Sequence, residues 1–119
     1  MEIDRPTDLA GALEALRQAP DATLLAGGTD LMVEINFGHT RPDHIIALRR
    51  VGELQELNGT IGSGVTWARL EQGPFRALAQ AARTVGSPQI RAAGTIGGNV
   101  ATASPAGDGL PYLVALDAE

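Results

Sequence analysis

The chain contains no cysteine and no lysine, and these two absences exclude several classes of function. Without cysteine, the chain cannot ligate an iron–sulfur cluster through its own thiolates, form disulfides or use a cysteine nucleophile. Without lysine, it has no P-loop lysine, no Schiff base and no lysine general base. All nine basic residues are therefore arginines, so any anion must be bound by arginine, by polar side chains or by the backbone.

Aromatic residues, positive charge and long apolar runs are also scarce. Aromatics make up 3% of the chain and the formal net charge is −5, which argues against a nucleic-acid-binding surface. No apolar run approaches the roughly 18–20 residues that span a bilayer, and the N-terminus is too polar for a signal peptide. We therefore expect no membrane span and a cytoplasmic location.

What is present indicates a packed domain, or part of one, with an aliphatic core. Hydrophobic residues are 44% of 119 residues. The leucines of residues 9–16 recur at helical spacing until Pro20 stops the pattern. Apolar runs at residues 23–26 and 44–48 have the length of buried strands. These elements predict a small α/β lobe over residues 1–55.

A second lobe is predicted over residues 56–119. Residues 60–65 favour a strand, residues 66–70 a short helix capped by a threonine, and residues 74–85 a longer helix that begins at a proline. A further apolar helix is predicted over residues 110–116. No strand follows to cover this helix, so we expect the second lobe to be incomplete. The predicted class is a truncated α+β fold with two lobes.

Two glycine pairs are the clearest candidates for a binding site. Gly27-Gly28 follows a predicted strand, and Gly97-Gly98 lies between predicted helices; each pair has threonine and a short polar side chain beside it. Consecutive glycines allow positive φ and a close approach of backbone to a ligand, and successive N–H groups can form a nest for an anion. The alternative is that both are ordinary tight turns.

Other candidate side chains have weaker support. Asp30 and Asp108 form either an acid–base couple, or a helix cap and an acceptor for ligand hydroxyls. Arg91 faces either a phosphate or solvent. His39 and His44 have no cysteine and no second histidine at helical spacing, so we expect no metal site.

Three longer motifs carry a resemblance to a known family. AGGTDL at residues 26–31, SPQIRAAGTIGGN at 87–99 and ASPAGDGLPYLVALDAE at 103–119 resemble the FAD-binding medium subunit of molybdenum hydroxylases. This family includes the flavoprotein subunits of carbon monoxide dehydrogenase and the flavin domain of xanthine dehydrogenase. The resemblance runs in order over nearly the whole chain and implies a two-lobed FAD-binding domain of the PCMH type.

The resemblance also implies a set of cofactor-binding residues. Backbone amides of residues 25–31 and 95–99 would hold the pyrophosphate of FAD, and Thr102 and Asp108 would reach other polar groups. A carboxylate at Asp30 would repel phosphates, so we expect it to face backbone N–H groups or a ligand hydroxyl. No residue is expected to be catalytic. The predicted FAD-binding residues are Leu25, Ala26, Gly27, Gly28, Thr29, Asp30, Leu31, Thr95, Ile96, Gly97, Gly98, Asn99, Thr102 and Asp108.

The family relationship further implies a function and partners. An iron–sulfur small subunit and a molybdopterin-binding large subunit would deliver electrons, and FAD would pass them to a terminal acceptor. Subunits of this family are much longer than 119 residues, so we expect weak retention of FAD by this chain alone. The alternative function is a non-catalytic assembly or binding module that keeps the fold without flavin.

Overall fold

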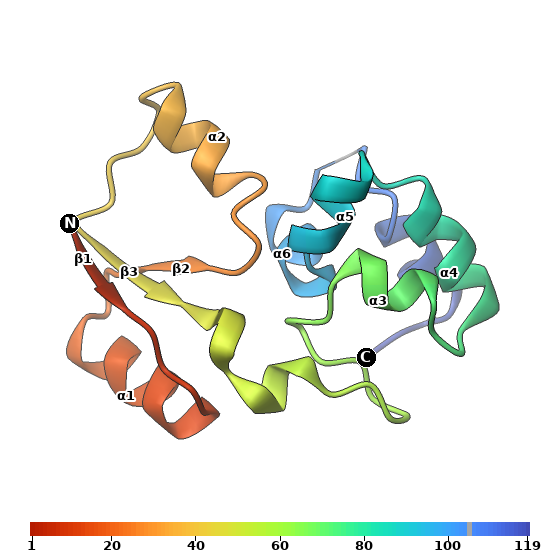
Figure 1. Ribbon diagram of the computed structural model, residues 1–119, viewed down its shortest axis with the longest axis horizontal. Coiled ribbons are helices and arrows are strands. Elements are labelled where there is room, and N and C mark those ends of the chain that lie inside the picture. The colour runs from red at the N-terminus through yellow and green to blue at the C-terminus, as the bar shows by residue number, and fades with distance from the viewer. Residues whose placement is uncertain (105) are drawn as a thin grey trace.

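The computed structural model describes residues 1–104 and 106–119, which form two lobes joined by two short 3-10 helices (Figure 1). The predicted mixed α+β, two-lobed architecture is confirmed. Pro105 of the ASPAGDG motif lies outside the described residues. In chain order, the elements are β1 (Glu2–Asp4), α1 (Leu9–Gln18), β2 (Thr23–Leu25), α2 (Leu31–Asn36), β3 (His44–Ala47), η1 (Leu48–Arg50), η2 (Gly52–Gln55), α3 (Trp67–Glu71), α4 (Arg76–Arg83), α5 (Pro88–Ala93), α6 (Ile96–Thr102) and α7 (Leu110–Ala115).

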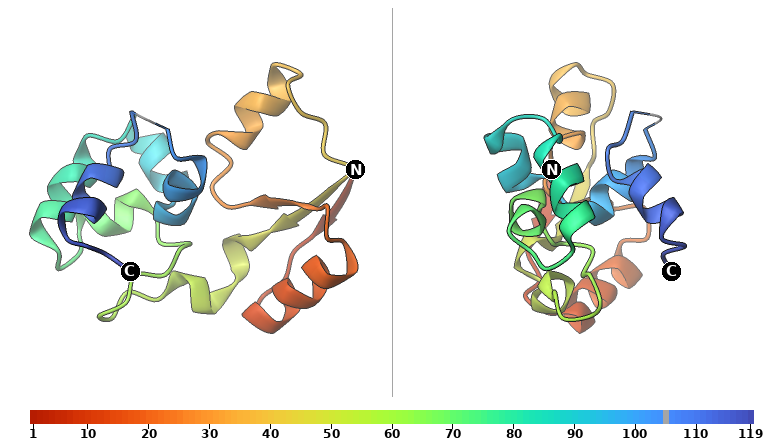
Figure 2. Two further views of the ribbon diagram at one scale, coloured as in Figure 1. Left: turned by 180° about the vertical axis from the view of Figure 1, so that it is seen from behind. Right: turned by 90° about the vertical axis from the view of Figure 1, so that its right-hand side faces the viewer.

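The first lobe is built on a parallel sheet with the strand order β1-β3-β2. Parallel strands need crossover connections, and α1 and α2 supply them on opposite sides of the strands (Figures 1 and 2). The central strand carries two deeply buried residues, Ile45 and Ile46, which are 3% and 0% exposed. The predicted domain boundary after residue 55 coincides with the end of η2 and stays a prediction.

Side-chain caps fix where several helices begin. Asp8 caps α1 by accepting a hydrogen bond from the backbone N–H of Gly11 at 2.7 Å. Thr66 caps α3, Ser87 caps α5 and Thr95 caps α6 in the same way. Each cap pairs an N–H group that the first helical turn leaves without a partner. The helix predicted over residues 9–16 and the helix start predicted at Thr66 are therefore confirmed.

The second lobe is a cluster of short helices around a small aliphatic core. Its centre is Trp67, which is 2% exposed, together with residues of α3, α4 and α6. The predicted apolar stripe of α4 faces this core, and the helix begins at Arg76 rather than at Pro74. The buried members of the cluster are Val65, Trp67, Leu70, Leu78, Ala82, Val85 and Ile96.

The strand predicted over residues 60–65 was wrong. This segment is a turn with isolated bridges, and it folds back onto η2. Gly62 N–H donates to the carbonyl of Glu56 at 2.7 Å, and Gly64 N–H donates to that of Leu54 at 2.8 Å. A Cβ on Gly62 would collide with the carbonyl of Leu54. Glycine is needed here because the backbone of this turn packs closely on that of η2, and the sequence pattern of the segment does not reveal this contact.

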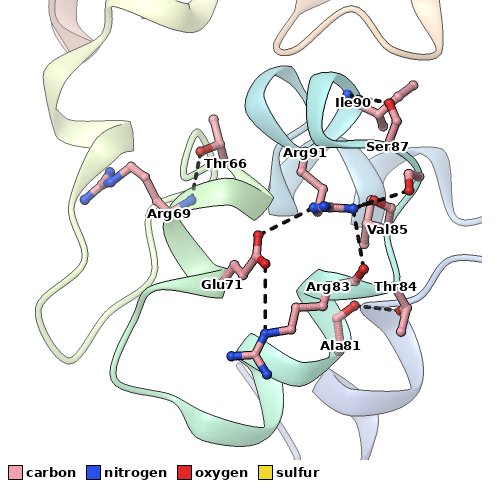
Figure 3. Close-up of polar contacts among 11 residues, drawn as sticks. Thr66, Arg69, Glu71, Ala81, Arg83, Thr84, Val85, Ser87, Ile90 and Arg91 are labelled. Atoms are coloured by element: carbon pink, nitrogen blue, oxygen red, sulfur yellow. Dashed lines mark hydrogen bonds and ion pairs between the residues drawn. The ribbon is translucent and has the colours of Figure 1, made fainter.

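Arg91 is a structural residue, not one that faces a phosphate or open solvent. Its Nη1 donates to the carbonyls of Arg83, Val85 and Gly86 at 3.4, 3.1 and 3.3 Å, and its Nε lies 3.5 Å from a carboxylate oxygen of Glu71 (Figure 3). The side chain is 16% exposed. These contacts fix the turn between α4 and α5, and therefore the position of α5 beneath the second glycine segment.

We predict that Arg91→Gln lowers the free energy of unfolding by about 1.5–3 kcal/mol, because charge-assisted hydrogen bonds to three carbonyls are lost. Arg76→Gln is the matched control, since Arg76 is exposed and its side chain has no hydrogen bond or ion pair within residues 1–104 and 106–119. Urea denaturation measures both variants. Equal stability of the two would show that the Arg91 contacts contribute nothing.

Candidate functional site in the cleft between the lobes

The first glycine segment, residues 26–30, runs from the end of β2 to the start of α2. Gly28 has φ +76°, a conformation that side chains other than glycine's rarely adopt. The carbonyls of Gly28 and Asp30 accept hydrogen bonds from Met32 and Glu34 of α2, both at 3.0 Å. This turn redirects the chain toward the second lobe.

Gly27 allows the two lobes to approach each other. A Cβ on Gly27 would collide with the carbonyl oxygen of Ala93 and lie 2.9 Å from the Cα of Gly94. Real Cβ atoms are essentially never closer than 3.0 Å to such atoms. The first glycine segment therefore packs directly on the end of α5, and only glycine fits there.

The amides of the first segment remain available for a ligand. Within the described part of the chain, the N–H groups of Gly27, Gly28 and Thr29 donate no hydrogen bond. Backbone N–H groups are strong donors that are rarely left without a partner in a folded protein. Consecutive free donors at a glycine turn are the arrangement that binds phosphate oxygens.

The second glycine segment is helical, which corrects the prediction of a loop. Thr95 is the N-cap of α6, and its Oγ1 accepts a hydrogen bond from Gly98 N–H at 3.0 Å. Ile96 N–H donates to Val65 and Gly97 N–H to Ser63, at 3.0 and 2.9 Å. The segment becomes a helix because this cap and these long-range bonds together outweigh the low helix propensity of glycine.

The two sets of amides predicted to hold a pyrophosphate therefore differ in how many N–H groups are free to donate. In the second segment, the N–H groups from Ile96 to Asn99 already have partners, since Asn99 N–H donates to the carbonyl of Thr95 at 3.1 Å. In the first segment, the corresponding donors are free. Whether either segment contacts FAD stays a prediction, but the free donors lie in the first.

Two adjoining cavities lie where the lobes meet, with volumes of about 490 and 300 Å³. Volumes of this size are typical of small-molecule sites. Both cavities are bounded by the glycine segments, so together they form one cleft. Their shared lining consists of Leu24, Ala26, Gly27, Thr95, Gly98 and Ala101.

The cleft gathers most of the predicted site residues, and three lie elsewhere. Leu25 and Ile96 line neither cavity, and Ile96 packs into the core of the second lobe at 6% exposure. Asp108 is exposed and also lines neither cavity. The predicted residues that line the smaller cavity are Ala26, Gly27, Gly28, Thr29, Asp30, Leu31, Thr95, Gly98, Asn99 and Thr102; Gly97 lines the larger one.

Asp30 and Thr102 meet across the cleft. The Oγ1 of Thr102, the last residue of α6, donates to Oδ2 of Asp30 at 3.1 Å. Asp30 is also the N-cap residue of α2, but its side chain makes no capping hydrogen bond there. Asp30 was predicted to face backbone N–H groups or a ligand hydroxyl. Its carboxylate instead accepts from a hydroxyl of this chain, and a contact with a ligand hydroxyl stays a prediction.

Sequence reasoning missed the residues that η1 and the neighbouring turns bring to the larger cavity. Arg49 is the only charged residue that lines this cavity within the described ranges, and Asp30 is the only one in the smaller cavity. Gln55 and Ser63 add polar groups. Arg49 and Arg50 are indistinguishable by sequence pattern, and only the backbone path of η1 selects the first.

Asn99 has an unsatisfied acceptor. Its Oδ1 is buried and has no hydrogen-bond partner in the described part of the chain, and it lies beside Gly107 and Gly109. Leaving a buried polar atom unpaired costs about 1–3 kcal/mol. Asn99 is also one of the residues that line the smaller cavity.

A polar cluster outside the cleft was also missed. Glu2, Asp4 and His44 lie on neighbouring strands with their oxygen and nitrogen atoms within 4.8 Å of one another. His44 Nε2 and Asp4 Oδ2 are 2.8 Å apart, so a hydrogen bond explains part of this closeness.

We predict that Ala destabilises the protein much more at Gly97 than at Gly98, the two glycines of α6. A Cβ on Gly97 would lie 2.6 Å from the Cβ and the carbonyl oxygen of Ser63, so Gly97→Ala should lower the free energy of unfolding by about 1–3 kcal/mol. A Cβ on Gly98 would meet only Thr95 Oγ1 at 3.0 Å and Ala26 Cβ at 3.9 Å. Gly98→Ala should therefore change stability by less than about 1 kcal/mol. Urea denaturation measures both, and a Gly97→Ala variant as stable as the parent would contradict the packing.

Comparison with known proteins identifies the family. The family model for the FAD binding domain in molybdopterin dehydrogenase matches residues 1–119. The nicotinate dehydrogenase FAD-subunit of Eubacterium barkeri is 43% identical, over 91% of this chain and 40% of its own length. The carbon monoxide dehydrogenase medium chain of Hydrogenophaga pseudoflava is 32% identical, over 98% of this chain and 45% of its own.

The fold agrees with that assignment. A crystal structure of Cu,Mo-CO dehydrogenase in its cyanide-inactivated form matches with a TM-score of 0.85 and 31% identity, over 95% of this chain and 43% of the other. The chain thus spans less than half the length of these relatives. In residues 1–104 and 106–119, no helix is both long enough and apolar enough to cross a bilayer. By sequence and by fold, the chain belongs to the family of FAD-binding domains of molybdopterin dehydrogenases.

Proposed function

We propose that this chain grips the nucleotide part of FAD in an electron-transfer subunit of a molybdenum hydroxylase. The observation that carries the proposal is the cleft in which the free amides of Gly27, Gly28 and Thr29 line the same cavity as Gly98. Residues 1–55 and 56–119 act as the two sides of this cleft. Each side contributes one glycine segment.

The chemistry of the first glycine segment fits a diphosphate. Hydrogen bonds between backbone N–H groups and a charged phosphate contribute about 1.5–3 kcal/mol each. The chain has no lysine and a net charge of −5, so backbone donors are its main resource for an anion. Arg49 adds one positive charge at the adjoining cavity.

The remaining lining of the smaller cavity fits a ring and a hydroxylated linker. Ile90 supplies apolar surface for a flat ring, and Leu31 adds to it from the first lobe. The unpaired Oδ1 of Asn99 is an acceptor for a hydroxyl. Donors for phosphate, apolar surface for a ring and an acceptor for a hydroxyl are the three kinds of group that FAD requires.

The residues of this chain bind and orient the cofactor and need no acid–base chemistry of their own. Bound FAD supplies the redox chemistry, accepting electrons and releasing them to a terminal acceptor. Because residues 1–119 contain no cysteine, any thiolate-ligated cluster lies outside them. We propose that these are an iron–sulfur small subunit and a molybdopterin-binding large subunit, and that the large subunit selects the organic substrate.

The test is FAD binding by the full-length protein that the gene encodes, expressed and purified in parallel with the 119-residue chain. We expect the full-length protein to be yellow and to gain about 2.7 kcal/mol of stability when free FAD exceeds Kd a hundredfold. Thermal melts with and without added FAD measure this gain. A colourless protein with no gain would instead favour a flavin-free assembly module.

We predict that Arg49→Gln weakens FAD binding about three- to tenfold at low salt, because an exposed cation near phosphates contributes roughly 1 kcal/mol. The loss should shrink as salt increases, since the Debye length falls to about 3 Å at 1 M. Arg50→Gln is the matched control, because Arg50 neighbours Arg49 in η1, is exposed and lines neither cavity. Equal affinity of both variants in an FAD titration would remove Arg49 from the site.

A further inference from the structure

Asp30 presents an electrostatic problem within the proposed site. It follows directly after the free amides of residues 27–29, and it is the only charged residue that lines the smaller cavity within the described ranges. A carboxylate and a diphosphate beside the same cavity repel each other, and because Asp30 is exposed, this repulsion is screened by salt. A free Asp30 side chain would therefore oppose the ligand that its neighbours favour.

The structure contains a contact that restrains this carboxylate. Thr102 Oγ1 donates to Asp30 Oδ2 at 3.1 Å, and the two residues are 72 positions apart in the chain. Asp30 lies at the start of α2 in the first lobe, and Thr102 ends α6 in the second. One hydrogen bond thus orients the carboxylate and ties the two lobes together beside the cleft.

We propose that Thr102 is a positioning residue. Its hydroxyl holds the Asp30 carboxylate toward α6, so that the amides of residues 27–29 can donate hydrogen bonds to a phosphate. This inference rests on the proposed function, because it concerns the same cleft. It differs from a direct role for either side chain. In a direct role both side chains would touch the ligand, whereas here each is occupied by the other.

The proposal predicts that a second substitution restores binding: removing the charge of Asp30 should reverse the effect of removing the hydroxyl of Thr102. In Thr102→Val the carboxylate is released near the phosphates, and FAD binding should weaken about five- to tenfold. In Asp30→Asn the amide oxygen still accepts from Thr102 and the negative charge beside the phosphates is gone, so FAD should bind at least as tightly as it does to the parent. In the double variant there is no charge to restrain, and the Kd should return to within about threefold of the parent.

The experiment is an FAD titration of the full-length protein and these variants, followed by flavin fluorescence at low and high salt. The defect of Thr102→Val should diminish at high salt, because screening weakens charge repulsion. A purely structural defect would not respond in that way. The matched controls are Thr60→Val and Asp21→Asn, since both residues are exposed and their side chains make no hydrogen bond in residues 1–104 and 106–119.

The outcomes separate this inference from the proposed function. If the parent protein does not bind FAD, the proposed function fails and this inference fails with it. If the parent binds FAD but the double variant is as weak as Thr102→Val, only the positioning role of Thr102 is overturned. If Asp30→Asn is itself as weak as Thr102→Val, Asp30 contacts the ligand directly, which also overturns the inference.

Discussion

The architecture depends on the contact between Gly27 and the backbone at the end of α5. A side chain at this position would overlap the Ala93 carbonyl and separate the lobes. The contact brings residues 26–30 of the first lobe against Thr95 and Gly98 of the second, and so creates the cleft. Glycine in place of a residue with a side chain costs roughly 0.5–1 kcal/mol in conformational entropy. This cost is offset in function, because the close approach of the lobes forms the cleft.

The two glycine segments look alike in sequence but differ in whether their backbone amides already have hydrogen-bond partners. In α6, the amides of Ile96 and Gly97 donate to Val65 and Ser63, and those of Gly98 and Asn99 donate to Thr95, so all four already have partners. In the first segment, the amides stay free, and the hydrogen-bonded groups are the carbonyls of Gly28 and Asp30. The second lobe thus lines the cleft with small residues whose amides are already bonded, and the first lobe contributes the free N–H donors. Preorganisation of this kind lowers the ordering cost of binding.

Local patterns predicted the elements that local interactions determine. The helix over residues 9–16, the cap at Thr66 and the strand predicted at residues 44–48 follow from nearby residue types, and all are present, the strand as β3. Long-range contacts decided the rest. The segment at residues 60–65 became a turn through bonds to η2, and residues 96–102 became a helix through bonds to that turn. Neither set of hydrogen-bond partners can be predicted from the residues that neighbour the segment in sequence.

The same distinction explains the electrostatics of the site. Arg91 stands close to the second glycine segment in sequence, yet its guanidinium is committed to the carbonyls of the preceding turn. Arg49 is far from both segments in sequence, yet the path of η1 brings it to the cleft. Backbone amides do not titrate in the physiological range, and arginine stays protonated throughout it. The proposed phosphate contacts, which use these groups, are therefore insensitive to pH, and Asp30 is the only acidic residue among the described residues that line either cavity.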